Sequence, residues 1–325
     1  MEGFYDDFEI DPVLLEKQRE AMEKVKNIII FHPLFKSIYQ EMLKCHMLSK
    51  NSTKPECLCI LGESGAGKTT VLEHYRDKFP RREEKDGSTI PVLLVELPSG
   101  AKPKDVASKI LFEMGDPFFD KGTEKTMKVR IVDYIDKCGV QLLILDEFNH
   151  LIDSDTKRVL QKVADWIKGL ANTVKIPIIL SGVPAAERIF KVNIQLDTRF
   201  TNRQRLKPFK FDKNFRGLLK GIDEEHPFTE SSHLSDPKMA EKLYYATRGN
   251  MRILMRLIES ATYEAVAADR NKLTEDDLFV AFSGIELSAR PHAVNPFNNA
   301  SFNFKVAIAE EKKKMKKDDE DESTS

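Results

Sequence analysis

A glycine-rich segment near residue 65 has the residue types and spacing that bind phosphate groups. Because glycine has no Cβ, backbone N–H groups can turn inward around phosphate oxygens, and a following helix directs its positive dipole end at the same anion. In such a cradle Lys68 contacts the β- and γ-phosphates, and the Thr69 hydroxyl ligates Mg²⁺. The pattern predicts a nucleotide site formed by Gly62, Glu63, Ser64, Gly65, Ala66, Gly67, Lys68, Thr69 and Thr70.

A second motif, residues 142–147, is an apolar strand that ends in two acids, Asp146 and Glu147. A phosphate cradle needs a second strand, which we expect beside the first, whose acid holds the Mg²⁺ shell. We expect Asp146 to face the metal and Glu147 to polarise the attacking water as general base. The second acid favours a hydrolase over a kinase, since a kinase must keep water out of its site.

Three more polar positions are candidates for the same reaction. Ser181 ends a predicted strand, where a hydroxyl could orient water near the γ-phosphate. Arg199 is far from the cradle in sequence and could reach a neighbouring subunit's nucleotide, a role that Arg203 or Arg205 could share. Arg252 stands in the first turn of a predicted helix, where a cation is unfavourable, so we expect it to contact the γ-phosphate. The simpler alternatives are a polar strand terminus for Ser181 and solvated surface arginines for the others.

The surrounding chain alternates short apolar strands with amphipathic helices. Nearly all-apolar strands separated by helices indicate a parallel sheet covered on both faces. The fold class is therefore α/β: a phosphate-binding parallel sheet with flanking helices, followed by a small all-helical lid. Strands are predicted at 57–61, 92–97, 142–145, 176–180 and 205–209, and helices at 34–47, 69–79, 104–114, 124–137, 156–170, 212–221, 236–247, 250–268 and 274–283, the last with a capping box of Thr274 and Asp277.

These elements suggest four parts: an N-terminal helical extension (1–25), a nucleotide-binding domain (26–211), a helical lid (212–284) and a C-terminal extension with a charged tail (285–325). The tail carries a basic block followed by an acidic block, and we expect it to be disordered. The residues between 80 and 88 are predicted to be a charged loop.

The bulk composition is that of an ordinary soluble globular protein. The chain has 325 residues, 41% hydrophobic and 32% charged, with a net charge of −1, so charge must be assessed locally before nucleic acid is excluded. Its four cysteines lack metal-ligand spacing and are expected to be buried free thiols. The acidic N-terminus is no signal peptide and no apolar run reaches about 18 residues, which predicts a cytoplasmic protein.

Together these motifs resemble the AAA+ superfamily, in its initiator-like clade, over residues 25–285. Within it the chain most resembles the TniB/TnsC family of transposition ATPases. The segments that carry this second resemblance are Phe31-His32-Pro33, Gly62 to Thr70, Leu145-Asp146-Glu147-Phe148-Asn149-His150, Ile179 to Pro184, Gln195 to Phe200, Leu206 to Phe209 and Asn295-Pro296-Phe297.

The resemblance implies roles for residues of the site. Ser181 corresponds to sensor 1, Arg199 to the arginine finger that acts in trans, and Arg252 to sensor 2 on the lid. His32 and Pro33 are expected near the adenine. The implied cofactors are ATP and Mg²⁺.

The resemblance also implies a regulator rather than a recombinase. Such proteins assemble as hexameric or heptameric rings, or as helical filaments, on double-stranded DNA in the bacterial cytosol. They link a TniQ-type target selector to a TnsB/TniA-type transposase in Tn-like and CRISPR-associated transposons, and hydrolysis resets the assembly. The identity of the selector and the transposase surface are left open by the sequence.

In relatives, DNA is held by loops and helix starts after the second strand, which correspond here to residues 99–104 and 121–128. The absence of an aromatic series in these segments predicts sequence-nonspecific, salt-sensitive backbone binding. Asp105 and Glu124 reduce the net positive charge of these two segments. The alternative is that the lysines are ordinary solvated charges of surface loops. The expected DNA contacts are Lys102, Lys104, Lys121, Thr123 and Lys125.

Other functions stay open at this point. A signalling switch of the AAA+ or STAND type would bind protein partners but not DNA. A replication-initiator or helicase-loader-like ATPase often carries a winged helix, for which residues 285–325 are too short. Glu147 beside Asp146, and the helical lid, argue against a small-molecule kinase. Salt-dependent DNA binding in the presence of ATP separates the transposition reading from the signalling switch.

Overall fold

The computed structural model describes residues 11–49, 52, 54–85, 87–152, 157–297 and 301–323. The chain forms two compact units. An α/β unit comprises Pro33–Lys207, and a helical unit combines Met1–His32 with Pro208–Ser325. This division differs from the expected boundaries, because the first helix packs with the C-terminal helices instead of standing as a separate extension.

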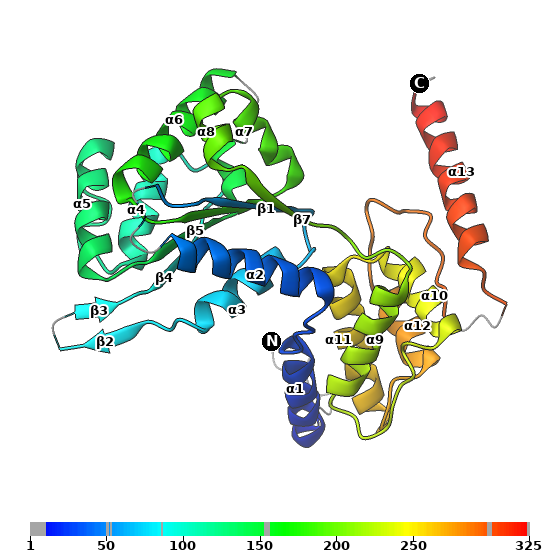
Figure 1. Ribbon diagram of the computed structural model, residues 1–325. Coiled ribbons are helices and arrows are strands. Elements are labelled where there is room, and N and C mark those ends of the chain that lie inside the picture. Colours follow the sequence, from blue (N-terminus) through cyan, green and yellow to red (C-terminus); the bar gives the residue numbers. More distant parts are fainter. Residues whose placement is uncertain are drawn as a thin grey trace, which may run out of the picture. The chain divides into compact units, whose positions relative to one another are not determined.

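The α/β unit is built on a five-stranded sheet of order β4-β5-β6-β1-β7, in which every pairing is parallel (Figure 1). All residues of the β1, β5 and β6 strands are buried, as expected where helices cover both faces. The parallel α/β prediction is thus confirmed. The strands are β1 (Leu58–Gly62), β4 (Val92–Glu96), β5 (Leu142–Asp146), β6 (Ile178–Gly182) and β7 (Asn202–Leu206).

The strand order corrects one expectation. The strand that ends in Asp146 was predicted to lie beside the strand of the cradle, but β6 lies between them. The strand order depends on which strands pair through their backbones, and the motif sequences alone do not reveal it. The fifth strand also begins earlier than predicted, because β7 lies at an edge of the sheet and tolerates polar residues.

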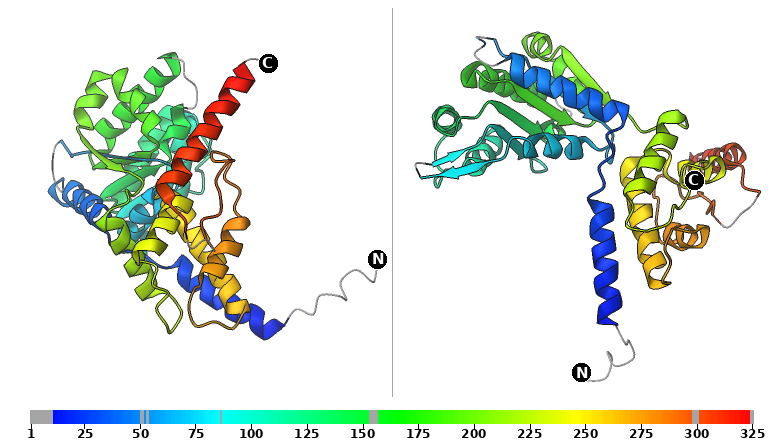
Figure 2. Two further views of the ribbon diagram at one scale, coloured as in Figure 1. Left: turned by 90° about the vertical axis from the view of Figure 1, so that its right-hand side faces the viewer. Right: turned by 60° about the horizontal axis from the view of Figure 1, so that its bottom comes forward.

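Helices cover the two faces of the sheet (Figures 1 and 2). Leu145 and Leu180 pack in one core with residues of α5 and α6, and successive strand side chains point to opposite faces. Asp146 and Ser181 therefore point to the other face, which α2 and α3 cover. The helices of this unit are α2 (Pro33–Leu48), α3 (Lys68–Asp77), α4 (Pro103–Glu113), α5 (Glu124–Lys137), α6 (Lys157–Val174), α7 (Arg188–Lys191) and α8 (Ile194–Arg199), with 3₁₀ turns η1 (Phe148–Ile152) and η2 (Pro184–Glu187).

The segment predicted as a charged loop contains a small antiparallel hairpin. Its strands are β2 (Arg82–Glu84) and β3 (Gly87–Thr89). Both are three residues long and mostly polar, so they show no apolar alternation. Gly87 has φ 139°, a conformation that glycine adopts without steric cost.

In the helical unit α1 packs along α11. Val25 of α1 joins the buried core of this unit, Gln18 Nε2 donates to the Tyr263 carbonyl at 3.3 Å, and Lys26 pairs with Glu259 at 3.0 Å. The predicted capping box at the start of α12 is present. The helices are α1 (Pro12–Lys26), α9 (Lys213–Glu225), α10 (Pro237–Thr247), α11 (Met251–Ala267), α12 (Glu275–Ser283) and α13 (Phe304–Ser323).

The tail that was expected to be disordered is helical from Phe304 to Ser323. Glu311 ties this helix to its own unit: it is only 4% exposed, and it accepts from Arg290 Nε at 2.7 Å and from Arg248 Nη2 at 2.8 Å. Burial raises the pKa of Glu311, but the hydrogen bonds and charges of the two arginines outweigh it and leave the pKa below its usual value. The sequence shows the charge blocks but not this buried pair.

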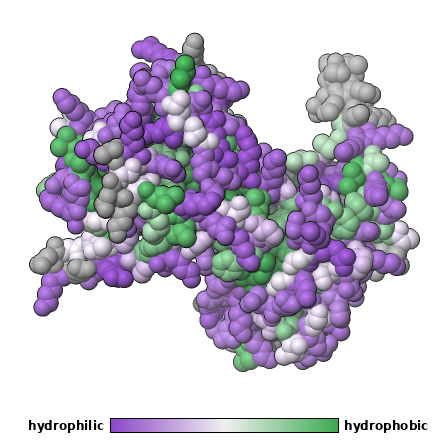
Figure 3. Space-filling view, in the orientation of Figure 1, coloured by the Kyte–Doolittle hydropathy of each residue, from purple (hydrophilic) through white to green (hydrophobic). Residues whose placement is uncertain are grey.

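All four cysteines are buried and free, as predicted. The surface is mostly hydrophilic on the face in Figure 3, with hydrophobic patches between. Within the described ranges, no helix combines the length and the apolar character that crossing a membrane requires.

Candidate nucleotide site

The phosphate cradle connects β1 to α3, as the sequence predicts. A Cβ on Gly62 would lie 2.6 Å from the Leu206 carbonyl oxygen of the neighbouring β7, so only glycine fits there. Gly65 and Gly67 have φ angles of 78° and 93°, which are costly for other residues. The backbone therefore approaches closely and turns sharply where phosphate oxygens would be held.

The two motifs predicted from sequence meet in space. Thr69 Oγ1 donates to Asp146 Oδ2 at 2.8 Å, across the sheet from one motif to the other. Lys68 is 4% exposed, and its Nζ donates to the Gly62 carbonyl at 2.9 Å. A hydroxyl and a carboxylate beside a phosphate cradle suit Mg²⁺, which takes few protein oxygens and completes its shell with phosphates and water. The described residues hold no group of three or more His, Cys, Asp or Glu side chains arranged as a metal site.

Glu147 follows in an unusual backbone conformation. Its φ is 53°, its N–H donates to Asp146 Oδ1 at 2.9 Å, and its side chain is partly exposed. A non-glycine residue in the left-handed region costs free energy and is commonly retained at functional sites. The turn separates the two carboxylates: Asp146 is buried against Thr69, and Glu147 stays accessible to water.

Ser181 lies in β6, between the strand of the cradle and the strand of Asp146. It is fully buried, and its Oγ has no hydrogen-bond partner among the described residues. Leaving a buried hydroxyl unpaired costs about 1–3 kcal/mol. The hydroxyl lies on the same face of the sheet as Asp146. A nucleotide bound at this face could provide the hydrogen-bond partner that the hydroxyl lacks among the described residues.

Asn149 connects the loops that follow two neighbouring strands. The sequence indicates no separate role for it, and it appears there only as part of the segment from Leu145 to His150. Asn149 Oδ1 accepts from the Val183 N–H at 3.1 Å and so joins the ends of β5 and β6. A Cβ on Gly182 would come 2.7 Å from the same oxygen. His150 Nδ1 bonds the Leu97 carbonyl at 2.8 Å and fixes the next turn to the end of β4. The polar residues after Glu147 therefore hold the edge of the sheet together.

Arg199 lies near the amino ends of the strands, whereas the cradle of the same chain lies at their carboxyl ends. These two sides of the sheet are called the amino edge and the carboxyl edge below. Arg199 ends α8 just before the amino end of β7, whereas the cradle follows the carboxyl end of the parallel neighbour β1. Five strand residues at about 3.3 Å each separate the two edges by roughly 16 Å. Arg199 is therefore placed away from its own nucleotide.

The three candidate arginines differ in their partners. Arg203 donates to Asp197, bonds Glu187 at 3.5 Å and stacks 4.1 Å from the Phe190 ring centroid. Arg205 also bonds Glu187, at 2.5 Å. Arg199 donates to the neutral amide of Asn172. Among these three, Arg199 is the one that has no carboxylate partner within the described ranges.

Three further predicted residues are Arg252 and His32 of the helical unit and Pro33 of the α/β unit. Arg252 is exposed at the second position of α11, whose N-cap is Asn250. The His32 ring lies 4.8 Å from that of Phe209, and burial lowers the pKa of His32 to about 4, so it is neutral near pH 7. Pro33 begins α2 of the α/β unit. The γ-phosphate role of Arg252 and the adenine roles of His32 and Pro33 stay predictions.

The predicted DNA-contact residues mark the starts of two packed helices, α4 and α5. Lys102 is the N-cap of α4, and its N–H is held by Asp105 Oδ2 at 2.9 Å, so this acid caps the helix. Thr123 caps α5 by accepting from the Thr126 N–H at 3.3 Å. All the predicted contacts are exposed: Lys102, Lys104, Lys121, Thr123 and Lys125. Their binding to DNA stays a prediction.

Solved structures share this fold. The ORC2 protein of Aeropyrum pernix (ADPNP-ADP complexes) matches at 18% identity and TM-score 0.62, over 83% of this chain and 74% of that one. Cdc6p of Pyrobaculum aerophilum matches at 14% and 0.60, over 80% and 69%. Aeropyrum pernix ORC1 in complex with DNA matches at 14% and 0.58, over 82% and 69%. At these identities the likeness establishes the AAA+ fold and no more.

The family assignment comes from the sequence. No curated protein matches the chain. The family model of the bacterial TniB protein matches residues 22–211, which is more than half of the chain. This range holds the five-stranded sheet, the cradle, the acid pair, Ser181 and Arg199, whereas Arg252 and Asn295-Pro296-Phe297 lie outside it. This chain therefore belongs to the TniB family.

Proposed function

We propose that this TniB-family protein is an ATP-hydrolysing, DNA-binding regulator of transposition. The observation that carries the proposal is the hydrogen bond from Thr69 to Asp146, which joins the phosphate cradle to the acid pair within an AAA+ fold. Family membership directs the proposal to transposition.

Each residue of the site has a part in hydrolysis. The cradle and Lys68 bind the phosphates, and Thr69 with Asp146 would hold Mg²⁺, which neutralises charge on the phosphates when bound. Glu147 accepts a proton from the attacking water. The buried Ser181 hydroxyl donates to the γ-phosphate or to that water.

The position of Arg199 supports assembly of several copies. Because it lies at the edge opposite its own cradle, its proposed role as an arginine finger requires the nucleotide of a neighbouring copy. Repeated head-to-tail contacts of this kind give rings when they close and helical filaments when they do not.

DNA binding is proposed for the exposed lysines at the starts of α4 and α5. Helix N-termini and lysines both attract phosphate, without reading base sequence. One protein of similar fold, Aeropyrum pernix ORC1, has been solved in complex with DNA. The assembly on DNA would then present a surface to a TniQ-type target selector and a TnsB/TniA-type transposase.

The test measures retention of a duplex DNA at several salt concentrations, with ATP, with ADP and without nucleotide. We expect ATP-dependent retention whose affinity falls steeply with salt. Replacing Lys102, Lys104, Lys121 and Lys125 by alanine should flatten the log–log salt slope by up to about 3–4, since each phosphate contact contributes about 0.9.

A matched control removes four exposed lysines from other elements, Lys17, Lys24, Lys213 and Lys220. It changes the net charge equally and should leave the salt slope unchanged. Absence of ATP-dependent DNA retention by the wild-type protein would contradict the proposal and favour a signalling switch that binds protein partners.

A further inference from the structure

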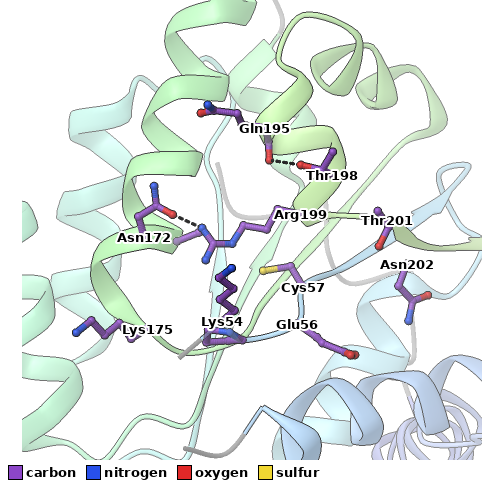
Figure 4. Close-up of a pocket in the computed structure, with 12 residues that line it drawn as sticks. Lys54, Glu56, Cys57, Asn172, Lys175, Gln195, Thr198, Arg199, Thr201 and Asn202 are labelled. Carbon is purple, nitrogen blue, oxygen red and sulfur yellow. Dashed lines mark hydrogen bonds between the residues drawn. The ribbon is translucent and has the colours of Figure 1, made fainter. Parts of the chain in front are cut away.

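A pocket of about 910 Å³ lies at the amino ends of β1, β6 and β7 (Figure 4). It is on the edge of the sheet opposite the phosphate cradle, and Arg199 points into it beside Asn172 and Cys57. Three chain segments line it, residues 54–57, 171–175 and 195–202. None of these residues belongs to the cradle or to the acid pair.

The pocket carries positive charge that its own walls do not neutralise. Lys54, Lys175 and Arg199 line it, and none of them forms a salt bridge with a residue in the described part of the chain. Glu56 is the single carboxylate in the lining. Figure 4 shows the Lys54 side chain directed toward Arg199, and the side chains of Glu56 and Lys175 directed away from it. Burial raises the pKa of the Cys57 thiol, so this neighbour is neutral as well. Three cations around one pocket favour an anionic occupant.

Lys175 has a backbone conformation that costs free energy for a lysine. It follows the last residue of α6 with φ 50°, a left-handed conformation that glycine or asparagine adopts more readily. A costly backbone at the rim of a cationic pocket suggests that the lysine side chain serves a purpose there.

The same face carries an exposed apolar side chain. Ile194, in the first turn of the helix that ends in Arg199, is 79% exposed. It lies one helical turn before Thr198, which lines the pocket. An exposed isoleucine gains stability by packing against another protein surface, whereas a free small anion offers it no apolar contact. The occupant of the pocket is therefore expected to be an anion carried by a protein.

We propose that this pocket receives the triphosphate of ATP bound to a neighbouring copy of the chain, and that Lys175 and Lys54 act there with Arg199. Asn172 is a positioning residue: its neutral amide holds the guanidinium without neutralising it. The proposal rests on the proposed function and extends it to these residues. In a head-to-tail assembly the amino edge of one sheet meets the carboxyl edge of the next, where the cradle lies.

The experiment measures steady-state ATP hydrolysis on duplex DNA. Lys175→Asn removes the charge and keeps a residue suited to the left-handed backbone, so we expect folding to persist and kcat to fall about tenfold. Lys162→Asn removes a lysine of α6 that is exposed like Lys175 and lies outside the pocket, so this control should stay within about twofold of wild type. Asn172→Asp should lower kcat more, about 100-fold, while thermal stability holds or rises, because the new carboxylate pairs with Arg199.

Mixing locates the effect in trans. Glu147→Gln subunits lack the base but present an intact pocket to their neighbours. An equimolar mixture with Lys175→Asn should raise hydrolysis per Lys175→Asn subunit about fivefold, since half of these subunits gain an intact neighbour.

Wild-type kcat in Lys175→Asn, or a loss that mixing does not restore, overturns the assignment of Lys175 to the trans pocket. A loss of stability in Asn172→Asp that matches the loss of kcat overturns the positioning role of Asn172. Arg199→Ala in the same assays distinguishes failure of the proposed function from failure of the further inference. If it hydrolyses ATP normally, the shared nucleotide site of the proposed function fails; if it is impaired and restored by mixing while Lys175→Asn is normal, only the further inference fails.

Discussion

The two edges of the central sheet differ in how their polar groups are matched. At the carboxyl edge, Lys68 bonds the Gly62 carbonyl and Thr69 bonds Asp146. At the amino ends, Arg199 has a neutral partner, and Lys54 and Lys175 form no salt bridge with any residue that the structure describes. The polar groups at the carboxyl ends are therefore matched within one chain, and we propose that the charge at the amino ends is matched by the nucleotide of another copy.

This difference explains why one AAA+ chain is expected to hydrolyse ATP poorly alone. In the proposed function, the matched groups of one chain bind ATP, and the unmatched cations of another copy stabilise the charge of the transition state. The following substitutions test each edge, beginning with the largest expected effect.

Replacing Glu147 by glutamine tests the carboxyl edge. We expect at least about a 100-fold loss of kcat with ATP binding preserved, because an amide cannot accept the proton of the attacking water. The measurement pairs steady-state hydrolysis with nucleotide affinity from titration. Normal hydrolysis by this variant would show that another group is the base.

Replacing Arg203 by alanine separates the matched arginine from the unmatched one. Arg203 is bound by two acids and stacked on Phe190, so we expect the variant to lose about 1 to 2 kcal/mol of unfolding free energy. Hydrolysis per folded subunit should stay near wild type. A collapse of kcat without loss of stability would transfer the finger role from Arg199 to Arg203.

Acid titration tests the matched pairs on a finer scale. The hydrogen bond from Arg205 lowers the pKa of Glu187 below its ordinary value of 4.5. Its contribution to stability is therefore fully present above pH 4.5 and is lost as pH falls through the lowered pKa. Melting temperatures of wild type and Glu187→Gln should differ slightly at pH 7 and converge at low pH, since exposed pairs contribute about 1 kcal/mol or less. A difference that grows on acidification would contradict this pairing.

The cradle and the acid pair were predictable because their chemistry depends on residue type and short spacing. Gly62, Lys68 and Asp146 are recognisable in the sequence, and the structure brings them together. The place of Ser181 at a strand end is visible in the sequence. That its hydroxyl is buried without a partner among the described residues is known only from the packing.

The amino edge was predictable only in part. The sequence offers three arginines, and the choice among them depends on where Glu187 and Asp197 fall in space. Asn172 and Lys175 gave no signal, since they are distant in sequence from Arg199 and lie at the end of an ordinary amphipathic helix. The order of the strands and the packing of α1 on α11 are likewise set by long-range contacts.

The most direct test of a nucleotide site shared between copies is complementation of two inactive variants. Arg199→Ala keeps its own cradle and base, and Glu147→Gln keeps its own arginine. We predict that each hydrolyses ATP at a small fraction of the wild-type rate on duplex DNA, and that an equimolar mixture recovers a substantial share of that rate. A mixture no more active than the sum of its two components would contradict the account.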